Sequence, residues 1–291
     1  MVSLEAIANS VASGFLLGGI LALTALGLSI VLGVMRLVNL AHGVFLIAGA
    51  YVGFFLLQAT GVDPIIALVP IGVVIGAAAL PVQRFLLEPL TKFGPEAPMM
   101  TTFGIAIVLE NLFVLYFSAD TRSIERDYAT VPLLLGPVSV PLVYVFGFVI
   151  SVGVILIVHA IVSWTSFGRD LRASAVDPGA AAAVGVDVRR VHALTFALGA
   201  ACAAAGGTLI GIIFSFTPAS GANYLLTDFA IVVLGGMGNI FGTLVGGILL
   251  GVLQSLAGIT LGDGYRDLVG LVLFLAVLAV RPQGLFRGHA A

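Results

Sequence analysis

Charged residues are scarce in this sequence. It has 12 Lys and Arg and 14 Asp and Glu among 291 residues, which is 9% of the chain, whereas 60% of the residues are hydrophobic. An ordinary soluble domain carries about 25% charged residues, and it could not bury this much apolar surface. The composition therefore excludes a soluble globular domain and indicates a protein whose solvent is lipid. The net charge of -2 gives no sign of a nucleic-acid partner.

Residues that carry catalytic or nucleotide-binding chemistry are also few. Lys92 is the sole lysine and follows a threonine, so the Gly-Lys-Ser/Thr ending of a phosphate-binding loop cannot occur. None of the four histidines belongs to a His-Glu-x-x-His motif, and the sequence has no Gly-x-Ser-x-Gly nucleophile motif. The single Cys202 excludes an intramolecular disulfide and a cysteine metal cluster. We therefore expect no enzymatic activity, no metal and no cofactor bound by this chain.

Long apolar runs are abundant. About 20 mostly apolar residues cross a bilayer, and we expect such spans at 11–34, 40–57, 65–87, 99–118, 141–162 and 193–216. The longer region 225–258 is broken at 235–239, which predicts two short helices, and a last span follows at 268–280. The expected fold is all-α, a polytopic transmembrane helix bundle of about eight or nine membrane segments that include short broken helices. We expect a single domain over residues 1–291.

The basic residues orient this bundle, because short cytoplasmic loops carry an excess of Lys and Arg. Four arginines share the loop 163–192, and alternation through nine segments places nine of the 12 basic residues on the side of that loop. We therefore expect the N-terminus outside and the C-terminus in the cytoplasm. The first apolar run has no basic segment ahead of it, so we expect no cleaved signal peptide and a location in a bacterial inner membrane.

The loop 163–192 contains the signals of a short helix. Asp177 suits an N-cap, Pro178 suits the first helical position, and Gly185 is placed to end the helix. Such a helix either packs the loop against the bundle or docks on another subunit. The residues alone leave both interpretations open.

Polar residues at membrane depth are costly and usually face a cavity or a partner helix. Glu110 and Asn111 fall in the middle of the fourth span, where a pore-lining or interhelical role competes with a packed, protonated Glu110. We expect Asp228 to begin a short helix near the outer face and to complement its dipole. In the alternative function, a secondary transporter of a small solute driven by an ion gradient, Glu110 and Asp228 would be the ion ligands.

Two further groups are candidates for the translocation path. Asn39 and His42 are expected at the inner end of the second span, where a helix-capping loop explains them about as well as a gate. The glycine run of Gly235, Gly236 and Gly238 permits close backbone approach. That suits a narrow pore wall and tight helix packing equally.

Several segments, in order along the chain, resemble permease subunits of ABC importers for branched-chain amino acids. The resemblance runs from about residue 14 to residue 288 and fits the LivH-type subunit, although Val44 and Pro178-Gly179 depart from the usual pattern. The segments that carry it are Gly27-Leu28, Gly33-Val34-Met35-Arg36, Asn39-Leu40-Ala41-His42-Gly43, Ala48-Gly49-Ala50-Tyr51, Thr101-Thr102-Phe103-Gly104-Ile105, Gly168-x-x-x-Arg172-Ala173, Leu234-Gly235-Gly236-Met237-Gly238-Asn239 and Arg281-Pro282-Gln283-Gly284-Leu285.

The resemblance implies an importer of two permeases and two ATPase subunits, fed by a periplasmic substrate-binding protein. This chain would form the translocation path for branched-chain or related small amino acids, with a second, LivM-type permease, while ATP is used by the ATPase subunits. Urea and short amides remain possible substrates. The implied ATPase-coupling residues are Gly168, Arg169, Arg172, Ala173, Asp177, Ala181, Ala182 and Gly185. The path or gate candidates are Asn39, His42, Glu110, Asn111, Gly235, Gly236 and Gly238.

Overall fold

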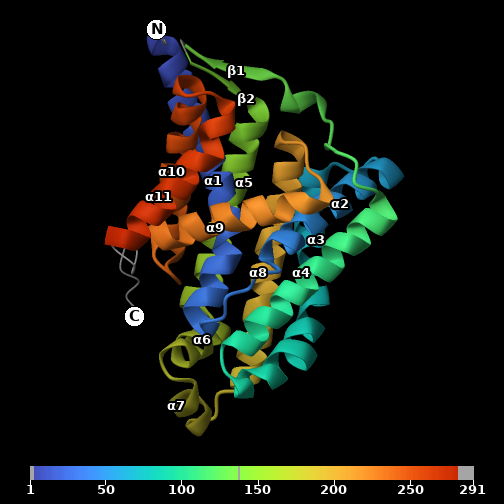
Figure 1. Ribbon diagram of the computed structural model, residues 1–291, viewed down its shortest axis with the longest axis vertical. Coiled ribbons are helices and arrows are strands. Elements are labelled where there is room, and N and C mark those ends of the chain that lie inside the picture. The colour runs from blue at the N-terminus through green and yellow to red at the C-terminus, as the bar shows by residue number, and fades with distance from the viewer. Residues whose placement is uncertain (1–2, 137, 281–291) are drawn as a thin grey trace.

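A computed structural model describes residues 3–136 and 138–280, and this part of the chain is a helix bundle with one short hairpin (Figure 1). The helices are α1 (Leu4–Met35), α2 (His42–Thr60), α3 (Pro64–Pro81), α4 (Glu96–Phe117), α5 (Leu142–Trp164), α6 (Ser166–Val176), α7 (Pro178–Ala183), α8 (Val188–Ile213), α9 (Gly221–Gly235), α10 (Ile240–Thr260) and α11 (Arg266–Val280). Strands β1 (Pro132–Leu135) and β2 (Val138–Pro141) pair antiparallel. Short turns of other helix types are η1 (Val82–Leu87), η2 (Glu88–Phe93), η3 (Asp127–Ala129), η4 (Pro218–Ser220) and η5 (Asp263–Tyr265).

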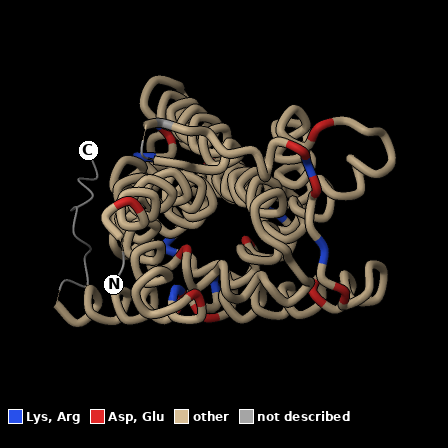
Figure 2. The backbone as a smooth tube through the Cα atoms, turned by 90° about the horizontal axis from the view of Figure 1, so that it is seen from above, with Lys and Arg blue, Asp and Glu red and all other residues tan. Residues whose placement is uncertain are grey.

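Seven helices of the described chain are long and apolar enough to cross a membrane. They are α1, α2, α3 with its continuation to Phe93, α4, α5, α8 and α10. Helices α9 and α11 have 15 residues each, which at 1.5 Å per residue span about 22 Å, less than a bilayer core of about 30 Å. Figure 2 shows how sparse Lys, Arg, Asp and Glu are along the backbone. The expected polytopic bundle with short broken helices is thus confirmed.

Helix α1 forms the centre of the bundle and packs along α10. An added Cβ at Gly14 would lie 2.6 Å from the Gly251 carbonyl oxygen, and one at Gly18 would lie 2.5 Å from the Gly247 carbonyl oxygen. The two helices approach so closely because both lack side chains at these crossing points, as is common in membrane helix pairs. Ser10 and Ser255 add a hydrogen bond of 2.9 Å between the two helices.

The turn between α9 and α10 lies where the sequence predicts a break in the apolar region 225–258. The turn between α9 and α10 falls in the region 235–239, as expected, with Gly236 at φ 84° and Gly238 at φ 78°. Glycine adopts such angles without the steric cost that a Cβ imposes. In contrast to the two short helices expected there, α10 has 21 residues and is a full-length helix.

Helices α2 and α9 both have unusual positions at mid-height of the bundle. Figure 1 shows α9 lying across the bundle at mid-height and α2 beginning at mid-height rather than at the end where α1 stops. The chain after Met35 therefore turns back into the bundle before α2 starts at His42. Asn39 and His42 thus lie at the start of the second span, as expected, but this start is at mid-height rather than at the end of the bundle.

The loop between α4 and α5 lies at the same end of the bundle as the N-terminus (Figure 1). Asp63, the N-cap of α3, accepts hydrogen bonds from Arg126 at 2.6 Å and from the Tyr128 hydroxyl at 2.9 Å. Backbone hydrogen bonds join Arg122 to Phe216. The loop is thus an ordered cap that includes the hairpin of β1 and β2.

Candidate functional site

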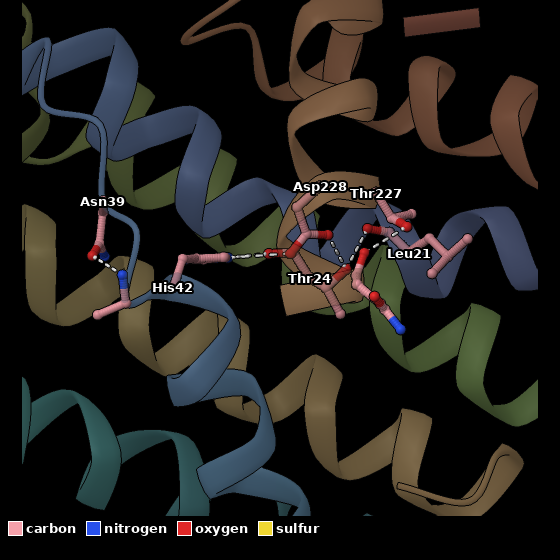
Figure 3. A network of polar contacts seen from close by, with 8 residues as sticks. Leu21, Thr24, Asn39, His42, Thr227 and Asp228 are labelled. Carbon is pink, nitrogen blue, oxygen red and sulfur yellow. Dashed lines mark hydrogen bonds and ion pairs between the residues drawn. The ribbon is translucent and has the colours of Figure 1, made fainter. Parts of the chain in front are cut away.

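Three polar residues from three separate helices meet in the interior of the bundle (Figure 3). Thr24 is 0% exposed, His42 is 0% exposed, and Asp228 is 1% exposed. Thr24 lies 11 residues before the end of α1 at Met35, which places it about 16 Å from that end of the helix. The contact is therefore deep within the membrane-spanning part of the protein.

The geometry of this buried contact is tight. The Thr24 hydroxyl lies 2.6 Å from Oδ1 of Asp228 and 2.7 Å from the Leu21 carbonyl oxygen. His42 Nε2 lies 2.9 Å from the Thr24 carbonyl oxygen and 3.5 Å from Oδ2 of Asp228. Thr24 thus holds α2 through its backbone and α9 through its side chain.

The position of α2 explains how His42 reaches this depth. His42 is the first residue of α2, and the Asn39 side chain accepts a hydrogen bond from the Ala41 backbone N–H at 3.1 Å. The Leu40 backbone N–H donates to the Thr102 hydroxyl of α4 at 3.1 Å. Asn39 therefore stabilises the start of the helix. Among the described residues, its side chain forms no hydrogen bond with Asp228.

Asp228 does not begin a helix. It lies in the middle of α9, which starts at Gly221, so the expected role as an N-terminal cap is wrong. The sequence pattern places carboxylates at helix ends because an isolated buried carboxylate is costly. Here the cost is reduced by a partner 204 positions earlier in the chain, which local sequence does not reveal.

Two atoms of this contact remain without a hydrogen-bond partner within the described residues. They are Nδ1 of His42 and Oδ2 of Asp228, both fully buried. Buried polar atoms are nearly always paired, and an unpaired one costs about 1 to 3 kcal/mol. Residues that keep such atoms deep in a membrane bundle are functional-site candidates.

The glycine turn between α9 and α10 packs on the lower part of α1. The Gly238 backbone N–H donates to the Ser29 hydroxyl at 3.2 Å, and the Thr243 hydroxyl lies 2.9 Å from the same oxygen. Gly235 lies against Gly242 with no room for a Cβ. Of the two interpretations of the glycine run, these contacts support tight packing.

Glu110 and Asn111 lie on α4, away from this contact. The Asn111 side chain donates to the Ile107 carbonyl oxygen of its own helix at 2.8 Å, and Glu110 is half-buried. No hydrogen bond or ion pair between described residues joins Glu110 to Asp228. Glu110 therefore has no direct contact with the Thr24, His42 and Asp228 group among the hydrogen bonds and ion pairs that the described residues form.

The loop 163–192 folds into α6 and α7 at the lower end of the bundle (Figure 1). The Asp177 side chain accepts hydrogen bonds from the backbone N–H groups of Gly179 and Ala180, at 2.8 and 3.1 Å, and so caps α7. At its other end, Gly185 has φ 94°, and its N–H and that of Val186 bond back to the last turn. The predicted cap, first residue and terminating glycine of this helix are confirmed.

The proposed coupling residues divide into two groups by position. Gly168 and Arg172 face the bundle: Gly168 leaves no room for a Cβ beside Val162, and the Arg172 guanidinium donates to the Val162 carbonyl oxygen. Ala181 is buried as well. The exposed residues are Arg169, Ala173, Asp177, Ala182 and Gly185.

These features define a multi-pass membrane protein of the permease class, with broken helices at mid-depth and a separate capped helix at one end. A family model described as the permease component of branched-chain amino acid transport systems matches residues 10–278. The chain belongs to this family. It is therefore the membrane-spanning component of a transport system that includes other components.

Curated relatives match over nearly the full length. The chain is 31% identical to the high-affinity branched-chain amino acid transport system permease protein LivH of Salmonella typhimurium, over 94% of this chain and 93% of that protein. It is 29% identical to the permease protein BraD of Pseudomonas aeruginosa over the same shares. The probable permease LivH of Methanocaldococcus jannaschii is 29% identical, over 91% of this chain and 88% of that protein.

Sequence reasoning missed Thr24 and assigned Asp228 to the wrong position. The sequence does show that Thr24, His42 and Asp228 lie in or beside apolar runs. Polar residues in such positions need a polar partner, so the three could have been selected as candidates. The pairing itself depends on α9 crossing the bundle. The carboxyl-terminal segment Arg281-Pro282-Gln283-Gly284-Leu285 lies outside the described residues.

Proposed function

We propose that this chain forms the translocation path for branched-chain or related small amino acids in an ATP-driven importer. The observation that carries the proposal is α7, a six-residue helix capped at both ends at one extremity of the bundle. Its outward residues are small and apolar, including Ala182 and Val184, the latter 82% exposed. Such a surface suits docking in a groove of a partner subunit.

The connections of α7 support a role in transmitting motion. Helix α6 joins it to α5, and Arg172 ties α6 to the Val162 carbonyl oxygen at the end of α5. On the other side only residues 184–187 separate α7 from α8. A force on α7 would therefore act directly on two membrane-spanning helices.

The partners in this proposal are a second, LivM-type permease, two ATPase subunits and a periplasmic substrate-binding protein. ATP is bound and hydrolysed by the ATPase subunits, and this chain binds no cofactor. The end that carries α7 faces the cytoplasm, with the N-terminus outside and the C-terminus inside. The names of the relatives and the basic residues near α7 support this arrangement.

The test is co-purification of the chain with its ATPase after Ala182→Glu combined with Val184→Glu. The change adds two charges to the exposed face of α7 and touches no buried residue. We expect loss of the ATPase and of ATP-driven leucine uptake, with unchanged thermal unfolding of the chain. Thr130→Glu, exposed at the other end of the bundle, is the control and keeps the ATPase. Intact assembly and uptake in the double variant would refute docking on α7.

A further inference from the structure

A basic groove opens beside the lower end of α3, outside the polar contact and next to the linker that joins α7 to α8. It has a volume of about 1070 Å³ and lies between η1, η2 and the start of α8. Arg84 and Lys92 line it from one side, and Arg189 and Arg190 line it from the other. All four cations are exposed, and no ion pair between described residues neutralises any of them.

The two acidic residues of the groove are already engaged. Oε2 of Glu88 lies 3.3 Å from Nε2 of Gln83 and 3.5 Å from Nδ1 of His192. Asp187 accepts a hydrogen bond from the Arg190 backbone N–H at 3.0 Å and caps α8. The groove therefore presents four cations and only two acids, and its surplus positive charge favours an anion.

Apolar side chains share the groove with these cations. Phe85 is 72% exposed and Leu194 is 37% exposed, and both line the groove together with Leu80. The Arg84 guanidinium lies 5.7 Å from the centre of the Phe85 ring. A small inorganic anion would not contact this apolar surface. An amphiphile with an anionic head group would contact the cations with its head group and the apolar side chains with its hydrocarbon chain.

The groove lies along the last part of the membrane-spanning helix that runs from Pro64 to Phe93. Pro81 closes α3, and the wider turn of η1 follows directly and carries Arg84 and Phe85. Basic pockets between membrane helices bind anionic lipid head groups. A drug-sized pocket is about 300 to 1,000 Å³, so the volume accommodates a head group and the first part of its chains.

We propose that this groove binds the phosphate head group of an anionic phospholipid, with its acyl chains along Phe85 and Leu194. The four cations hold the phosphate, and the site stabilises the junction between α3 and α8. The inference is independent of the proposed function, because it uses no contact of α7 and no property of the transported solute.

The test uses the full-length chain in nanodiscs of phosphatidylcholine with a minor share of phosphatidylglycerol. After detergent extraction and washing, mass spectrometry measures the phosphatidylglycerol retained per chain. For Arg84→Gln, Lys92→Gln, Arg189→Gln and Arg190→Gln combined, we expect at least a tenfold loss, because the variant removes all the positive charge of the groove. Replacing the three arginines with lysine keeps the charge and retains the lipid. Arg169→Gln, an exposed arginine outside the groove, is the matched control and also retains it.

Three further results decide the identity of the ligand. Phe85→Ser should lower retained phosphatidylglycerol while folding is unchanged, because it removes the apolar side of the site. Displacement of the lipid by millimolar inorganic phosphate would assign the groove to a free anion and overturn the proposal. Unchanged lipid with loss of the ATPase in the fourfold glutamine variant would assign the groove to the partner protein and also overturn it.

Discussion

The Thr24 hydroxyl lies 2.6 Å from the Asp228 carboxyl group across 204 positions of sequence, and both residues are buried. This hydrogen bond joins the middle of α1 to the middle of α9. The Thr24 carbonyl oxygen also holds His42 at the start of α2. One residue therefore contacts both α2, which begins at mid-height, and α9, which crosses the bundle.

Thr24→Val is expected to destabilise the protein by about 1 to 3 kcal/mol, because it leaves Asp228 buried without its hydroxyl partner. Thermal unfolding in detergent measures the change. Thr195→Val is the matched control, since among the described residues the buried Thr195 hydroxyl bonds only to the Val191 carbonyl oxygen of its own helix. Equal unfolding temperatures for the two variants would show that the contact with Asp228 contributes no stability.

Gly18→Val is expected to separate α1 from α10. The added side chain meets the Gly247 backbone, and overpacking of this kind costs about 1 to 3 kcal/mol. The same measurement on Gly153→Ala in α5 is the control, because an added Cβ there meets nothing within 4 Å. If the two variants unfold alike, close packing of α1 on α10 is not what stabilises the bundle.

Much of the fold follows from local sequence. The cap of α7 at Asp177 and its end at Gly185 depend on residues within one short segment, and so does the turn at Gly236 and Gly238. The position of Asp228 could not be predicted, because it depends on α9 crossing the bundle and on Thr24 far away in the sequence. The mid-depth start of α2 likewise depends on contacts with other helices rather than on its own apolar run.

Asp177→Ala is expected to weaken α7 by about 1 kcal/mol through loss of its N-cap. The result would be a lower ATP-driven uptake rate with little change in the unfolding temperature, because α7 has few contacts with the bundle. Asp177→Asn keeps a side-chain oxygen at the cap and should retain most of the uptake. If both variants transport at the wild-type rate, α7 does not transmit the energy of ATP hydrolysis.

The contact between Asp63 and Arg126 predicts a loss of stability in acid. Burial alone would raise the pKa of Asp63, but hydrogen bonds from the Ile65 backbone N–H, Arg126 and Tyr128 outweigh it and hold the pKa below its ordinary value. A carboxyl with a lowered pKa contributes stability above the pKa of its unfolded state, about 3.9, and this is lost as pH falls through the folded pKa.

The measurement compares the unfolding temperatures of the wild type and Asp63→Asn between pH 6 and pH 3. The wild type should be more stable at pH 6, and the difference should shrink below about pH 4. Burial, followed by the hydrogen bond to Asp63, raises the pKa of Tyr128 to about 12, so the contact should persist at moderately alkaline pH. A difference that stays constant down to pH 3 would contradict the account of Asp63.

The central claim, that the chain transports only when an ATPase acts on it, is tested most directly by leucine uptake into proteoliposomes. The chain alone should give no uptake under a proton or sodium gradient. With its partner permease, ATPase subunits and binding protein, it should give uptake that requires ATP. Gradient-driven uptake by the chain alone would contradict the account and favour a secondary transporter.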